Sequence, residues 1–330
     1  MVMFKKKIRT KNIIYIYILP LLLLQCYFIA SRDSLLPDYM MYYTIFNNPL
    51  LRPDIEVSFQ FISYLLSPIT NGFIIFLYIY SILGFLLKST AFYYIQPERK
   101  RLFYFFIFIV SYIFSFAIIW DYIQIRAGVG VSFLLIGLLS EKTFYRCLFL
   151  IIAILFHYSM VLPVCLFLLF MYVKNRKLKL LSIPLIVTLS LIFFFLTPYS
   201  ESYSKSNYNI QGRGIFDSLY LLIYITLFII YFFRKSIIPE FREVITSIFF
   251  TSLTITIIMV MMNKSFPAFT DRLVDITTFL SFLCLFFIRL KWYELFLLAY
   301  LCLFSFLRFR MAIQLFSDYP FISASSFYGG

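Results

Sequence analysis

The chain has 330 residues, of which 62% are hydrophobic and only 13% are charged, and its mean hydropathy is +0.91. No soluble domain of this length needs so many apolar residues, and repeated apolar runs of about 20 residues are typical of membrane-crossing helices. The net charge of +14 would suggest nucleic acid in a soluble protein, but here Lys and Arg lie in short loops between apolar runs, as the positive-inside rule describes. We therefore expect one integral membrane domain over residues 1–330 and no nucleic-acid partner.

The predicted fold is all-α and polytopic, with about 10–12 transmembrane helices. In chain order the predicted spans are 12–31, 71–93, 102–120, 127–140, 147–173, 180–196, 215–233, 244–262, 273–289 and 292–307. The run 147–173 is too long for one crossing and too short for two full ones. Interpreted as a hairpin of two short helices, it gives eleven spans and, with the N-terminus inside, puts most of the 29 basic residues in inner loops. A single crossing would instead leave the basic stretch 174–179 outside.

The hairpin needs a break, and the polar step from His157 to Ser159 together with Pro163 supplies one. Irregular backbone at membrane depth is tolerated only where protein or a water-filled cavity covers it. We therefore expect His157 to face the interior of the helix bundle and not the lipid.

The first outer loop, 32–70, is predicted to hold two short helices lying on or dipping into the membrane surface. Asp38–Phe46 and Asp54–Leu66 each carry apolar residues at helical spacing after an Asp with capping potential. A second outer loop, 197–214, is polar and carries Arg213 between two glycines. Asp271 and Arg272 precede the predicted span 273–289 on the same outer side.

Arg126 and His157 are the leading candidates for a functional site, because ionisable groups at membrane depth are costly. Arg126 offers a planar, permanently charged fork that suits a phosphate; the alternatives are an ion pair with Asp121 or an interfacial anchor. His157 is the only histidine of the chain, and it could accept a proton or donate a hydrogen bond near neutral pH. Its alternative is a structural histidine that bonds to a neighbouring helix.

Two carboxylates in the first outer loop, Asp38 and Glu56, are candidates for a general base or for binding sugar hydroxyls. Taken alone, they favour simpler roles, with Asp38 as a helix cap and Glu56 on a solvated face. Arg213 and Arg272 could join Arg126 in neutralising a diphosphate, although each in isolation is more often a loop charge. The sequence has no phosphate-binding glycine loop, no metal-ligand set and no serine-hydrolase elbow. We therefore expect neither a metal nor another cofactor.

The order of these elements resembles the EpsG/Wzy-type bacterial polysaccharide polymerases. The resemblance rests on the Asp-Tyr-x-x-Tyr element that contains Asp38 and Tyr42, and on Glu56 before a short apolar helix. It rests further on Gln-Ile-Arg-Ala-Gly around Arg126, on Leu-Phe-His-Tyr-Ser around His157 with Pro163 beyond, and on Asp-Arg-Leu around Arg272. The alanine after Arg126 departs from the Arg-Gln or similar pair expected there, which concerns the fine contacts and not the arginine's role.

The resemblance implies a membrane glycosyltransferase that joins polyprenyl-diphosphate-linked oligosaccharide repeat units on the outer face of the cytoplasmic membrane and releases polyprenyl diphosphate. It assigns catalytic roles to Arg126, His157, Asp38 and Glu56, and contacts with the diphosphate or sugars to Arg126, Arg213, Arg272 and Tyr42. It also allows a flippase and chain-length regulator proteins as partners. Two alternatives stay open: a transporter of lipid-linked oligosaccharides, although no matching halves are visible, and a membrane O-acyltransferase that modifies the glycan.

Overall fold

The computed structural model describes residues 19–25, 27–28, 38–49, 55–95, 101–196, 217–289 and 293–315. Within these ranges the chain is all-helical and forms no β-strand, as the composition predicts. It divides into two compact units: a first unit of Met1–Tyr158 with Phe309–Gly330, and a second unit of Ser159–Arg308. That all 330 residues form one membrane domain stays a prediction. Most of the predicted span 12–31 and all of the loop with Arg213 lie outside the described residues.

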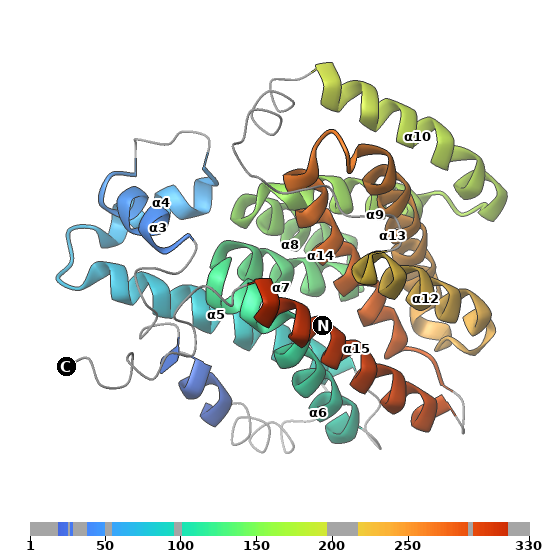
Figure 1. Cartoon of the computed structure of the whole chain (residues 1–330), viewed down its shortest axis with the longest axis horizontal. Coiled ribbons are helices and arrows are strands. Elements are labelled where there is room, and N and C mark those ends of the chain that lie inside the picture. Colours follow the sequence, from blue (N-terminus) through green and yellow to red (C-terminus); the bar gives the residue numbers. More distant parts are fainter. Residues whose placement is uncertain are drawn as a thin grey trace. The chain divides into compact units, whose positions relative to one another are not determined.

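The first unit is built on a layer of long apolar helices with two short helices at one end (Figure 1). Its elements are α3 (Tyr39–Asn47), α4 (Val57–Leu66), α5 (Gly72–Ile95), α6 (Arg101–Tyr112), the π-helix η2 (Ile113–Ile123), α7 (Ile125–Leu139) and α8 (Thr143–Phe156). Helix α7 packs against both α5 and α8, and the short helix α4 packs against α3, α5 and α8. The two predicted helices of the first outer loop are thus confirmed as helices, at Tyr39–Asn47 and Val57–Leu66.

Aromatic side chains pack the short helices α3 and α4 against α5. Phe59 of α4 is fully buried, with its ring centroid 4.8 Å from that of Phe76 and 5.6 Å from that of Tyr42. Edge-to-face and tilted aromatic pairs of this kind are favourable beyond the area that they bury. Part of the high Phe and Tyr content therefore serves the core of this unit, where it fixes the position of the first outer loop.

Helices α5 and α7 approach each other closely because small residues line their contact. The hydroxyl of Ser132 donates to the carbonyl oxygens of Gly84 (2.6 Å) and Gly128 (2.7 Å). A Cβ on Gly128 would lie 2.5 Å from the carbonyl oxygen of Trp120 and 2.7 Å from Oδ1 of Asp121, so only glycine fits there. This contact fixes the start of α7, where Arg126 stands.

The second unit is organised around α13 (Arg242–Met262), which packs against α9, α10, α12 and α14. Its other elements are α9 (Val161–Tyr172), α10 (Arg176–Leu196), α12 (Ser218–Phe232), the 3₁₀ turns η4 (Arg234–Ser236) and η5 (Pro239–Phe241), α14 (Pro267–Leu285) and most of α15 (Tyr293–Leu315). The turn η3 (Tyr158–Met160) joins the two units along the chain.

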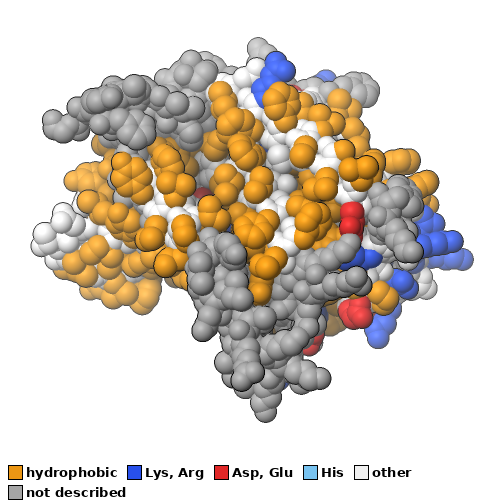
Figure 2. All heavy atoms as spheres, turned by 90° about the horizontal axis from the view of Figure 1, so that it is seen from below, with side chains coloured by type: hydrophobic (Ala, Val, Ile, Leu, Met, Phe, Trp, Pro, Cys, Tyr) orange, Lys and Arg blue, Asp and Glu red, His pale blue; other side chains and the backbone are white. Residues whose placement is uncertain are grey.

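Five helices among the described residues are long and apolar enough to cross a membrane, and five further apolar helices are shorter. The five long candidates are Gly72–Tyr93, Leu102–Ile123, Arg176–Leu196, Pro239–Met262 and Glu294–Gln314. Exposed apolar side chains dominate the face drawn in Figure 2. Helix α10 also exposes large apolar side chains, such as Leu181 (72%) and Phe193 (69%). Contiguous apolar surface of this extent requires a lipid environment, so the chain is a polytopic membrane protein.

The predicted break inside 147–173 is confirmed, and it lies at His157. Helix α8 ends at Phe156, and His157 has an extended backbone with φ −158° and ψ 109°. Pro163 stands in the first turn of α9, where its missing N–H removes no helical hydrogen bond. The break therefore belongs to the polar His-Tyr-Ser step and not to the proline. A reversal of the chain direction at this break stays a prediction.

Two predicted boundaries near the C-terminus were wrong. Helix α14 starts at Pro267, ahead of the predicted 273, and α15 continues to Leu315, beyond the predicted 307. Pro267 occupies the first position of α14, where proline favours a helix start. Arg308 stays within α15, where its Nη2 lies 2.7 Å from Oδ1 of Asp275. Arg308 is only 2% exposed, so it is a buried residue of α15.

Candidate functional site

Glu56 is the centre of a buried ionic cluster in the first unit. It immediately precedes α4 and is only 5% exposed. One carboxylate oxygen, Oε2, accepts a hydrogen bond from Nη1 of Arg126, and the other, Oε1, lies 3.0 Å from Nδ1 of His157. The expectation of a solvated Glu56 was therefore wrong, because α4 packs against α5 and α8 and carries the carboxylate inward.

Arg126 is the second residue of α7, which follows η2 after the single connecting residue Gln124. Its guanidinium lies against two rings, 5.2 Å from the centroid of Tyr42 and 5.6 Å from that of Phe59, as in cation–π pairs. A cation in the first turn of a helix is disfavoured by the helix dipole, and the carboxylate of Glu56 offsets this. The Nε atom of Arg126 is buried without a hydrogen-bond partner among the residues that the structure describes.

His157 lies in the break after α8, 8% exposed, with its backbone N–H still bonded to the carbonyl oxygens of Ala153 and Ile154. The same break is tied to the first outer loop by two more hydrogen bonds. The hydroxyl of Ser58 donates to the carbonyl oxygen of Leu155 (2.7 Å), and that of Tyr158 donates to the carbonyl oxygen of Ile55 (3.4 Å). His157 thus faces protein. Hydrogen bonds that join residues before and after it to the segment around Glu56 fix its position relative to Glu56.

Asp38 joins this cluster through Tyr42. The Tyr42 hydroxyl donates to Oδ2 of Asp38 at 3.5 Å, and the Tyr42 ring faces Arg126. The predicted capping role of Asp38 was wrong: its side chain makes no cap hydrogen bond, because its backbone is left-handed with φ 65°. Tyr42 is 1% exposed, so it supports Arg126 here, and its direct contact with a sugar stays a prediction.

The charges in this cluster set the ionisation of Glu56. Burial alone would raise the pKa of its carboxyl group, but the hydrogen bond with His157 and the positive charge of Arg126 outweigh burial and lower the pKa to about 2. Glu56 is therefore a carboxylate at all physiological pH values. It cannot take up a proton itself, but it can orient and stabilise a protonated His157.

A second buried ion pair, between Lys88 and Asp121, contacts the first turn of α7. Nζ of Lys88 lies 2.7 Å from Oδ1 of Asp121 and donates to the carbonyl oxygen of Gly128, while the hydroxyl of Tyr112 donates to Oδ2 of Asp121 (2.8 Å). Asp121 was one predicted partner of Arg126, and this interpretation was wrong. The direct ion pair also places Lys88 and Asp121 at one depth.

The remaining predicted site residues are not brought to this cluster. Arg272 is exposed on α14 in the second unit, and Arg213 lies outside the described residues. Their joint action with Arg126 on a diphosphate stays a prediction. Among the described residues no group of three or more His, Cys, Asp or Glu side chains is placed to hold a metal, and the expected absence of a metal stays a prediction too.

The sequence pointed to five of the clustered residues, Asp38, Tyr42, Glu56, Arg126 and His157, but gave no role to Phe59, whose ring faces the Arg126 guanidinium. The available signal was the apolar spacing of α4, which predicts an inward face for Phe59.

The fold and the cluster define a helical membrane protein in which a buried carboxylate, an arginine and a histidine meet beside the short helix α4. The EpsG family profile matches residues 13–326, nearly the whole chain, and the chain belongs to the EpsG family. No curated protein and no solved structure matches the chain. Membership of this family suggests a polysaccharide polymerase.

Proposed function

We propose that this protein is a glycosyltransferase that polymerises polyprenyl-diphosphate-linked oligosaccharide repeat units and releases polyprenyl diphosphate. The observation that carries the proposal is the cluster of Glu56, Arg126 and His157, which are far apart in sequence and meet in one buried place. Buried ionisable groups within a membrane protein are costly and mark functional sites by default. Membership of the EpsG family supports the same reaction class.

His157 is the proposed general base. A neutral imidazole that donates its Nδ1 proton to Glu56 has its lone pair on Nε2, so Nε2 is the nitrogen that accepts a proton. The hydroxyl group of the acceptor sugar loses its proton to Nε2, its oxygen bonds to the anomeric carbon of the donor, and the bond from that carbon to the diphosphate oxygen breaks. The ionised Glu56 then stabilises the imidazolium, as a carboxylate does in a catalytic triad.

Arg126 is the proposed contact for the leaving diphosphate. Glu56 occupies one guanidinium nitrogen, and the buried Nε still needs an acceptor. A buried donor without a partner costs roughly 1–3 kcal/mol, and a phosphate or sugar oxygen of the substrate would satisfy it. Negative charge that develops on the diphosphate during the reaction would strengthen this contact, which is the requirement for catalysis. Arg213 and Arg272 are proposed to add positive charge.

We propose the cytoplasmic membrane as the location, with the N-terminus inside and the cluster facing outward. The basic stretches 5–11 and 174–179 support this orientation through the positive-inside rule. The partners that fit the reaction are the lipid-linked repeat unit and the bilayer, with a flippase and a chain-length regulator acting before and alongside it.

The glycan profile of a deletion strain tests the function. Loss of a polymerase leaves surface glycan as single repeat units, and re-expression of the wild-type protein restores long chains. Loss of a transporter would leave no glycan outside, and loss of an O-acyltransferase would leave long chains without acyl groups. Either of these two profiles would overturn the proposal.

Purified protein tests the reaction without other cellular components. With synthetic polyprenyl-diphosphate repeat units it should form a ladder of longer glycans, and EDTA should not change the ladder, because arginines neutralise the diphosphate in place of a metal. Loss of the ladder in EDTA, with recovery on adding Mg²⁺, would contradict the metal-free mechanism.

A further inference from the structure

The second unit contains a cavity of about 630 Å³ whose lining is strongly basic. Six of its nine lining residues are Lys or Arg, and one is an acid: Lys174, Arg176, Lys179, Arg234, Lys235, Pro239, Arg242, Glu243 and Thr246. They come from the starts of α10 and α13, from the segment before α10 and from the turns after α12. A cavity with this lining has a positive potential that one carboxylate does not balance.

The direction of the helices makes this potential stronger. Helix α10 begins at Arg176 with no acidic residue in its first turn, and α13 begins at Arg242 with one acid, Glu243, in its first turn. The N-terminal end of a helix carries a partial positive charge, so basic side chains there are unfavourable while anions are favourable. The chain thus concentrates cations where its own backbone dipoles repel them. A bound anion relieves both contributions.

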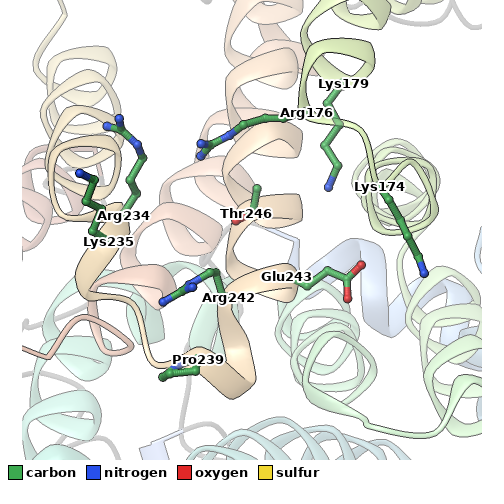
Figure 3. A pocket seen from close by; sticks show the side chains of 9 residues that line it. All are labelled: Lys174, Arg176, Lys179, Arg234, Lys235, Pro239, Arg242, Glu243 and Thr246. Carbon is green, nitrogen blue, oxygen red and sulfur yellow. The ribbon is translucent and has the colours of Figure 1, made fainter.

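The side chains are arranged to leave room for such an anion. Figure 3 shows Arg176, Arg234, Lys235 and Arg242 on one side of the start of α13, and Glu243 on its other side. On the side of Glu243, Lys179 is 4% exposed, and its ammonium donates to the Ser247 hydroxyl (3.5 Å) and lies 5.9 Å from the Phe250 ring centroid. The single carboxylate therefore does not occupy the space between the four cations.

We propose that this cavity binds a phosphate-bearing anion, with Arg176, Arg234, Lys235 and Arg242 as its contacts. Arginine forks and lysine ammonium groups are the usual partners of phosphate oxygens. Basic pockets between membrane helices are recognised sites for the headgroups of anionic lipids, and a soluble phosphate or diphosphate has the same chemistry. This site shares no residue with the Glu56 cluster, and the proposal of an anion site does not depend on the proposed polymerase reaction.

Thermal stability of purified protein, titrated with ligands, tests the site and separates its two sources. The probes are anionic phosphatidylglycerol or cardiolipin in mixed micelles, zwitterionic phosphatidylcholine as the neutral reference, and inorganic pyrophosphate. The test variant is Arg176→Gln/Arg242→Gln, whose two positions are exposed at helix starts. The matched control is Lys177→Gln/Lys264→Gln, which removes two exposed charges of the same unit outside the cavity.

We expect a phosphate-bearing probe to stabilise the wild-type protein and the control variant in a saturable manner. The test variant should bind about 25-fold more weakly, since each basic residue contributes roughly fivefold near an anionic headgroup. Stabilisation by the anionic lipids alone identifies a lipid headgroup site, and stabilisation also by pyrophosphate identifies a soluble ligand. Equal weakening in the control, unchanged binding in the test variant, or no stabilisation by any anionic probe would overturn the site.

Discussion

The Nδ1 atom of His157 lies 3.0 Å from Oε1 of Glu56, although the two residues are 101 positions apart in the sequence. The same carboxylate binds Arg126, 70 positions away from it. One acid, the residue before α4, therefore contacts both a guanidinium and an imidazole, and most of the predictions below depend on this arrangement.

Arg126→Lys should reduce polymerisation at least about 100-fold while the protein still folds. Lysine keeps the positive charge beside Glu56 but lacks the planar fork and the Nε donor, so it cannot bond to Glu56 and to a diphosphate oxygen together. Chain length in a complemented deletion strain measures the effect. Arg310→Lys, at an exposed position of α15, is the matched control, and equal loss in both would count against a special role for Arg126.

The stability of the protein should depend on Glu56 in acid. The pKa of Glu56 is lowered from 4.5 to about 2 in the folded state, so its stabilising contribution is complete above pH 4.5 and disappears as the pH falls toward 2. The contribution is on the order of 3 kcal/mol at neutral pH.

Unfolding temperatures of purified protein between pH 6 and pH 3 check this sign. The wild-type protein should lose more stability below pH 4.5 than Glu56→Gln, which has no carboxyl group to protonate. Parallel curves for the two proteins would show that Glu56 has no lowered pKa.

Lys88→Met should destabilise the protein strongly, by roughly 3–5 kcal/mol, because it leaves the carboxylate of Asp121 buried without its cation. The double variant Lys88→Met/Asp121→Asn should recover most of this loss, since the amide oxygen of Asn can still accept the Tyr112 hydroxyl. Denaturation in detergent gives both values. Additive losses in the double variant would mean that the pair is not coupled.

Gly128→Ala should cost about 1–3 kcal/mol and lower the activity, because its Cβ would press on the backbone of Trp120 and displace the start of α7. Gly84→Ala is the internal comparison, since the nearest atom to its Cβ would be Oδ1 of Asp121 at 3.3 Å. It should be tolerated better. A larger effect at Gly84 than at Gly128 would place the tight contact elsewhere.

Much of this structure follows from local sequence patterns, and the rest depends on pairing over long distances. Apolar runs between charged loops predict most of the described helices, and the polar step at His157 predicts the break. The ion pairs of Lys88 with Asp121 and of Arg308 with Asp275 were not predicted, because each joins residues 33 positions apart on different elements. Neither partner reveals the other by spacing along one helix.

In the candidate site, too, some residues follow from local patterns and others depend on long-range packing. Arg126 and His157 stand out alone, because a charge and the only histidine interrupt apolar sequence. Glu56 does not stand out, since a glutamate before a short helix in an outer loop usually faces water. Its burial depends on the packing of α4 against α5 and α8, which no local pattern specifies.

The most direct test of the central claim is polymerisation by purified His157→Asn with synthetic lipid-linked repeat units. The Asn amide can replace the Nδ1 donor to Glu56 but has no counterpart of the basic Nε2. We predict an unfolding temperature near that of the wild-type protein and a polymerisation rate lower by about 100-fold or more. A His157→Asn protein that forms glycan ladders within a few-fold of the wild-type rate would contradict the account.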